Sequence, residues 1–115
     1  MQLKSQYLHP DPDAPVVVTF GGSPQMRHQV VSRLESTGRL TVYGTLSEPE
    51  GMGRLSTLPR VDIVIIGGRY TDSQRSRIKA YVALHLPGTL TSGPGRDYPY
   101  DEEGMIRDVG KKLGW

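Results

Sequence analysis

The 115-residue sequence predicts an α/β fold in which helices cover both faces of a parallel sheet. Two runs, Val16–Phe20 and Val61–Ile66, are mostly apolar and β-branched, without polar alternation. A strand has such a sequence when both of its faces are buried, as they are between two helical layers. A pair of glycines and then a helix-start signal follow each run. Strand, turn and helix therefore alternate along the chain, which is the order of a doubly wound sheet.

Composition limits the classes of function. A chain of this length suits one domain, and its 36% hydrophobic content is sufficient for a core. The net charge of +2 is too small to indicate a nucleic-acid surface, although the pI near 9.0 leaves weak attraction of anions open. The absence of cysteine excludes disulfides and cysteine-rich zinc sites. No apolar run has the length of a membrane span or the pattern of a signal peptide. We therefore expect a cytoplasmic protein that binds neither membranes nor nucleic acid.

The first part of the chain is expected to lie outside the fold. Residues 1–15 carry Pro10, Pro12 and Pro15, and proline fixes the backbone and removes a hydrogen-bond donor. We therefore expect an extended, proline-rich N-terminal segment over 1–15. Ahead of the prolines we expect disorder, and the alternative is that the apolar Leu3, Tyr7 and Leu8 dock on this molecule or on a neighbour. Residues 16–115 are expected to form a single α/β domain.

The first buried strand leads into a helix. Ser23 is a favourable N-cap, and Pro24 occupies the first helical position, where its missing N–H costs nothing. Gly38 is a stop signal. The apolar residues recur with helical spacing and predict the inner face: Met26, Val30, Val31 and Leu34.

The next unit has weaker signals. Leu40–Gly44 alternates apolar and polar residues, which predicts a strand at one edge of the sheet. Ser47–Glu50 has the spacing of a capping box, but Gly51 and Gly53 disfavour a helix. We expect a short or irregular helix that ends near residue 58.

The second central strand leads into another helix. Thr71 and Gln74 have capping-box spacing, and Pro87-Gly88 ends the helical pattern. The expected inner face comprises Ile78, Tyr81, Val82 and His85.

The last elements are a short strand and a helix. Thr89–Thr91 predicts a strand at the other edge. Asp101–Glu103 and Lys111-Lys112 place negative and positive charge at the start and end of a helix, as the helix dipole favours. Its expected inner face comprises Met105, Ile106, Val109 and Leu113.

These elements predict a three-layer domain with a four-stranded parallel sheet of flavodoxin-like order 2-1-3-4, in which Val16–Phe20 and Val61–Ile66 are central. From about Pro15 onward, the element order, the second central run and its following helix resemble the receiver domain of two-component response regulators.

The resemblance does not extend to receiver chemistry. Gly21 and Gly22 stand where receivers carry an acidic pair, and Gly67 or Gly68 stands where they carry the phosphorylated aspartate. Thr91 or Ser92 could match the receivers' conserved hydroxyl, but their lysine and fifth strand have no counterpart. The resemblance implies a degenerate receiver-like module without a phosphoacceptor or a Mg²⁺ site.

A ligand site is predicted where the two central strands end, because ligands of such folds bind at this switch point. Two helix N-termini and the charge of Arg69 converge there, and neither loop carries Asp or Glu. Neither loop has the spacing of a dinucleotide-binding or P-loop motif, so the glycines could serve only to turn the chain. The candidate residues are Gly21, Gly22, Ser23, Arg27, Gly67, Gly68, Arg69, Tyr70, Ser92 and Gly93.

Catalytic and metal chemistry have little support. His9, His28 and His85 are far apart, so no metal site and no cofactor are expected. Ser23 and Ser92 lack a nucleophile-elbow motif, so a serine hydrolase or transferase is the least favoured hypothesis. The leading hypothesis is a non-catalytic interaction or signalling module with a protein partner or a second copy. The alternative is a small anion- or nucleotide-binding protein that uses the glycine loops.

Overall fold

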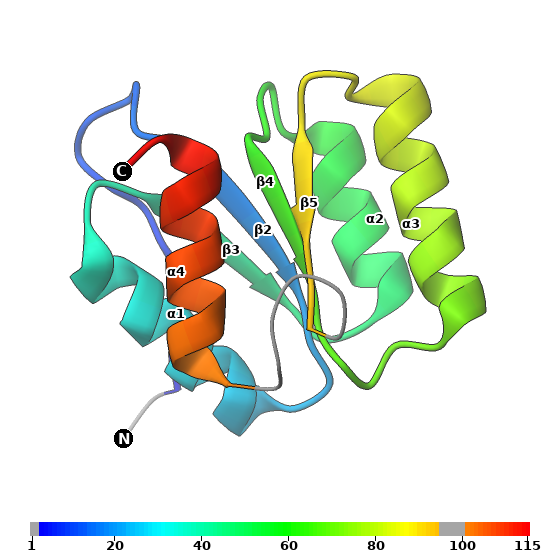
Figure 1. Cartoon of the computed structure of the whole chain (residues 1–115), viewed down its shortest axis with the longest axis horizontal. Coiled ribbons are helices and arrows are strands. Elements are labelled where there is room, and N and C mark those ends of the chain that lie inside the picture. Colours follow the sequence, from blue (N-terminus) through cyan, green and yellow to red (C-terminus); the bar gives the residue numbers. More distant parts are fainter. Residues whose placement is uncertain (1–2, 95–100) are drawn as a thin grey trace.

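The computed structural model describes residues 3–94 and 101–115. Figure 1 shows alternating strands and helices, with helices in layers on the two sides of one sheet. The described part of the chain has no helix that is long and apolar enough to cross a membrane. In chain order the elements are β1 (Gln6–Tyr7), β2 (Val16–Phe20), α1 (Pro24–Thr37), β3 (Thr41–Thr45), α2 (Glu48–Thr57), β4 (Ile63–Ile66), α3 (Asp72–His85), β5 (Leu90–Ser92) and α4 (Glu102–Leu113).

Within the described residues the sheet has five strands in the order β1-β3-β2-β4-β5. Strands β2, β3, β4 and β5 are parallel to their neighbours, and β1 is antiparallel to β3. The register places Val17 between Val42 and Ile63. The α/β class with a mainly parallel sheet is confirmed.

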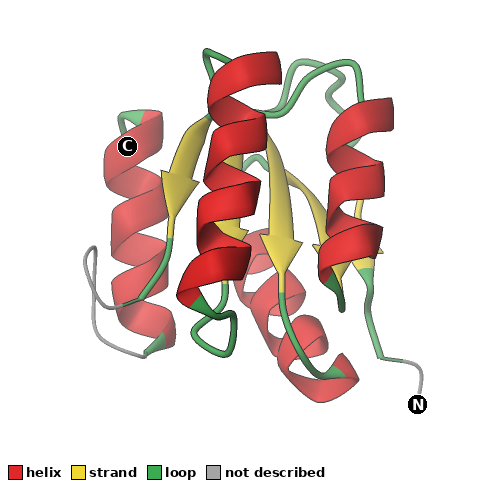
Figure 2. Cartoon of the chain, turned by 90° about the vertical axis from the view of Figure 1, so that its right-hand side faces the viewer, coloured by secondary structure: helices red, strands yellow, loops and turns green. Residues whose placement is uncertain are grey.

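Each face of the sheet has its own core, and the views in Figures 1 and 2 show the helices on either side of the strands. Helices α1 and α4 cover one face and contribute Val31, Leu34, Met105 and Val109 to its core. Helices α2 and α3 cover the other and contribute Leu55, Ile78 and Val82. Because β2 and β4 are buried on both sides, their sequences show no polar alternation.

The prediction of a four-stranded sheet is wrong, because the N-terminal segment adds β1 to its edge. Gln6 pairs with Tyr43, and the Gly44 N–H donates to the Ser5 carbonyl at 2.8 Å. Tyr7 packs against the core under α1 and α4. The prolines of this segment follow β1 and therefore do not interrupt its pairing. Strand β3, expected at the edge, is consequently covered.

Helix α2 was expected to be short or irregular but is a regular helix of ten residues. Ser47 caps it by accepting from the Glu50 N–H. Gly51 is buried, and a Cβ there would lie 2.1 Å from the ring of Phe20. The glycine that disfavours this helix locally is therefore what lets it pack closely on β2.

The predicted N-caps Ser23 and Thr71 are confirmed, and Thr71 forms the full capping box with Gln74. Asp101, where negative charge was expected at the start of the last helix, is the N-cap of α4. The predicted inner face of α3 is wrong at one position, because His85 is exposed and contacts the Tyr81 ring.

Two details near the central strands also differ. Met26 was expected on the inner face of α1 but is 48% exposed. The central strand begins at Ile63, and Asp62 before it accepts a hydrogen bond from the Val16 N–H at 2.7 Å.

Candidate functional site

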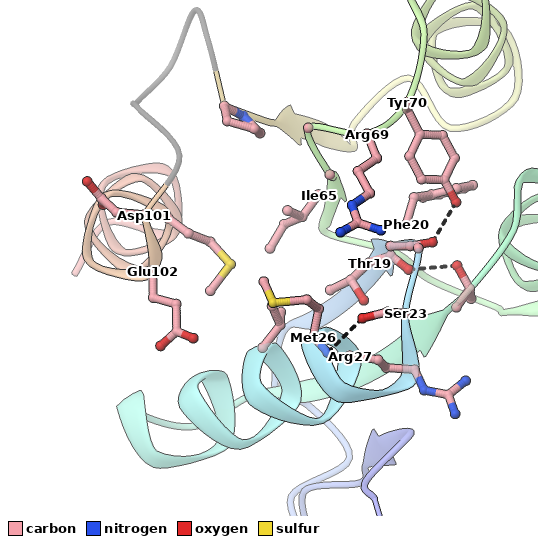
Figure 3. Close-up of a pocket in the computed structure, with 18 residues that line it drawn as sticks. Thr19, Phe20, Ser23, Met26, Arg27, Ile65, Arg69, Tyr70, Asp101 and Glu102 are labelled. Carbon is pink, nitrogen blue, oxygen red and sulfur yellow. Dashed lines mark hydrogen bonds between the residues drawn. The ribbon is translucent and has the colours of Figure 1, made fainter.

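A pocket of about 390 Å³ lies at the carboxyl ends of β2 and β4. At this point α1 leaves toward one face of the sheet and α3 toward the other, so the chain reverses its winding here. Figure 3 shows the pocket between α1, the two glycine loops and the start of α4. Its lining comprises Thr19, Phe20, Gly21, Gly22, Ser23, Met26, Arg27, Val30, Thr45, Ile65, Gly67, Gly68, Arg69, Tyr70, Pro94, Asp101, Glu102 and Met105.

The backbone of each glycine loop continues the hydrogen bonding of the sheet before it turns away. The Gly21 N–H donates to the Thr45 carbonyl at 3.0 Å, and the Gly67 N–H donates to the Phe20 carbonyl at 2.8 Å. A Cβ on Gly67 would lie 2.8 Å from that same carbonyl oxygen, so this close approach requires glycine. These two amides are occupied by the sheet and cannot bind a ligand.

Side chains then fix the two loops to one another. The Tyr70 hydroxyl donates to the Gly21 carbonyl at 3.0 Å, and the Tyr70 ring packs edge-to-face on Phe20 with centroids 6.0 Å apart. Burial raises the pKa of Tyr70, so its hydroxyl remains a donor at neutral pH. The Arg75 guanidinium donates to the Gly67 carbonyl at 2.9 Å. The rim of the pocket is therefore held in place before any ligand arrives.

The two predicted cations of the site have different environments. Arg69 is exposed at the rim, and it forms no hydrogen bond or ion pair with residues 3–94 or 101–115. The stem of Arg27 lies over Gly44, where a Cβ would be 2.6 Å from its Cγ. The Arg27 guanidinium consequently points away from Arg69 (Figure 3), and its Nε is buried without a partner in the described structure.

The start of α4 brings carboxylates to the opposite wall, although neither glycine loop carries one. Asp101 is occupied as the N-cap, since its carboxylate accepts from the Gly104 N–H. The Glu102 carboxylate lies 3.8 Å from the Arg33 Nε, which is a long contact for an ion pair. The pocket is therefore positive at the glycine loops and negative at α4.

Between these charged walls the pocket is lined by apolar side chains: Met26, Val30, Ile65 and Met105. Met26 lies at the mouth of the pocket on α1, and Met105 is buried on α4. This wall was not predicted. The sequence shows which face of α4 is apolar, but not that this helix docks beside α1.

The structure brings together every predicted residue of the two glycine loops, together with Arg27, but not Ser92 and Gly93. Ser92 is 2% exposed, and its hydroxyl donates to Asp108 at 2.6 Å, while Asp108 pairs with Lys112 at 2.5 Å. Gly93 lies against the Ile66 carbonyl.

Ser23, one of the two serines considered as a nucleophile, caps helix α1. The Ser23 hydroxyl accepts from the Met26 N–H, which is the work of an N-cap. Within the described ranges, no group of three or more His, Cys, Asp or Glu is placed to hold a metal ion. Comparisons with models of known protein families, with curated proteins and with solved structures found no match. The receiver-like resemblance is neither supported nor opposed by them.

Proposed function

We propose that the protein is a non-catalytic module that binds a small anionic ligand, such as one bearing a phosphate group, in the pocket at the glycine loops. The observation that carries the proposal is Arg69, a cation at the rim of a concave site that has no partner in the described structure. Pockets at the switch point of an α/β sheet are the usual ligand sites of such folds.

Most of the other described arginines have a partner. Arg33, Arg39, Arg60 and Arg77 pair with carboxylates, and Arg54 and Arg75 donate to amide or backbone oxygens. Among the described residues Arg27, Arg69 and Arg107 lack such a contact. Arg107 lies outside the pocket and the Arg27 guanidinium points away from Arg69, so Arg69 is the exposed cation at the pocket rim. The N-terminus of α1 beside it adds about half a positive charge. An anion at the rim would be attracted by both.

The rigidity of the rim also supports binding. The bonds from Tyr70 to Gly21 and from Arg75 to Gly67 order the loops in the free protein. Binding then requires little further ordering of the backbone, which favours affinity for a small ligand.

Isothermal titration with inorganic phosphate, combined with thermal unfolding, tests the proposal. A ligand at about a hundredfold excess over its Kd should stabilise the protein by about 2.7 kcal/mol. Arg69→Ala should abolish most of this gain. Arg107→Ala is the matched control, because Arg107 is exposed and lies outside the pocket.

The result that contradicts the proposal is also defined. If millimolar phosphate, sulfate and organic phosphates all leave the unfolding curve unchanged, the glycine loops are only turns. The interaction or signalling role, through a protein partner or a second copy, then remains as the hypothesis to test by measuring oligomeric state.

A further inference from the structure

We infer that the ligand is a mononucleotide whose phosphate lies at the glycine loops, whose base packs between Met26 and Met105, and whose sugar hydroxyls face Glu102. This inference rests on the proposed function and adds the chemical class of the ligand. The glycine loops and Arg69, where the phosphate would bind, were predicted site residues. Met26, Glu102 and Met105 were not predicted as site residues.

The size and the walls of the pocket exceed the needs of an inorganic anion. Its volume of about 390 Å³ falls at the lower end of the range for organic ligands, which is about 300–1,000 Å³. A single water molecule occupies about 30 Å³ of liquid. Val30 and Ile65 line the space behind the rim and offer nothing to a phosphate, but they can cover a flat apolar body.

Two methionines suit an aromatic ring in particular. Met26 extends from α1 at the mouth, where it is 48% exposed, and Met105 is buried on α4. Thioether sulfur is polarizable and makes favourable contacts with aromatic rings, and methionine adapts its shape to what it covers. A ring between them would remove the exposed Met26 side chain from water.

The distribution of charge favours a ligand that carries hydroxyl groups as well as a phosphate. Arg69 and Glu102 lie on opposite walls of the pocket (Figure 3). The Glu102 carboxylate has only the long 3.8 Å contact with Arg33, so it can accept further hydrogen bonds. It would weakly oppose any phosphate at the glycine loops, and a ligand with ribose hydroxyls compensates by donating hydrogen bonds to it.

The experiment is calorimetric titration of the full chain with adenosine 5′-monophosphate, ribose 5-phosphate and inorganic phosphate. We expect affinity to fall in that order. Met26→Ala should weaken adenosine monophosphate binding about 2- to 12-fold and leave phosphate binding unchanged. Leu84→Ala is its control, because Leu84 is 76% exposed on α3 and lies outside the pocket.

Glu102→Ala should change the affinities for the nucleotide and for inorganic phosphate in opposite directions. It should weaken the nucleotide by removing an acceptor and strengthen inorganic phosphate by removing a repelling charge. Glu35→Ala is the control, because Glu35 is a carboxylate that pairs with Lys4 and lies outside the pocket. Glu102→Gln, which keeps an acceptor oxygen, should retain most of the nucleotide affinity.

The possible outcomes distinguish failure of the nucleotide inference from failure of the proposed anion-binding function. If phosphate binds and the nucleotide binds no more tightly, the inference is wrong and the proposed function stands. If Met26→Ala or Glu102→Ala changes both ligands alike, the base and the sugar do not lie where we place them. If no anion binds at all, both fail.

Discussion

The two glycines of α2 provide a matched pair of substitutions with opposite expected effects. Gly51 faces the core, and a Cβ there would meet the Phe20 ring at 2.1 Å. Gly53 lies on the outer face of the same helix, where a Cβ would meet nothing within 4 Å. Neither has a positive φ, so alanine fits the backbone at both positions.

The structure sets the magnitudes. At Gly51 the new methyl group would be roughly 1.3 Å closer to the ring than ordinary van der Waals contact, which begins at 3.4 Å. Phe20 is 1% exposed and also packs on Tyr70, so the ring has no free space to enter. Overpacking costs about 1–3 kcal/mol, and we take the upper value because the ring is confined. The gain in helix propensity of about 1 kcal/mol offsets part of it and leaves a net loss of about 2 kcal/mol.

At Gly53 only the propensity gain applies, so alanine should stabilise the protein by about 1 kcal/mol. For a domain of this size each kcal/mol shifts the Tm by about 4 °C. Urea and thermal unfolding of the two variants should therefore differ by about 3 kcal/mol, with Gly51→Ala below the parent and Gly53→Ala above it. Equal stabilisation of both variants would refute the close packing of α2 on Phe20.

Three further perturbations test other contacts of the fold. Tyr70→Phe removes the hydroxyl that donates to the Gly21 carbonyl, so it should lower the free energy of unfolding in urea by about 1 kcal/mol and weaken phosphate binding. An unchanged free energy of unfolding and an unchanged phosphate affinity would mean that the pocket rim does not depend on this bond. Deletion of residues 1–13 removes β1 and should lower the Tm measurably, whereas an unaltered Tm would show that the paired edge adds no stability. The Arg77 guanidinium holds the pKa of Glu48 below its usual 4.5, so this pair stabilises the fold above that value and the contribution is lost as pH falls through the lowered pKa. Unfolding between about pH 5 and pH 3 should therefore show a steeper loss in the parent than in Glu48→Gln, and parallel curves would contradict it.

Local signals were sufficient for much of the fold. The continuous apolar runs predicted β2 and β4 because burial on both faces leaves no place for polar alternation. The N-caps at Ser23 and Thr71 were readable because a cap satisfies backbone donors within three residues. The meeting of the two glycine loops also followed, since parallel strands that neighbour one another end at the same edge of a sheet.

The fold class, the two central strands and the glycine-loop side of the candidate site therefore follow from local patterns along the chain. The tertiary structure alone decided that β1 joins the sheet, because the pairing of Gln6 with Tyr43 depends on an edge formed far along the chain. It also decided that Glu102 and Met105 complete the pocket, since no local pattern says where a helix docks. Gly51 illustrates the reason: its local preference opposes a helix, and its close packing against Phe20 across the core overrides that preference.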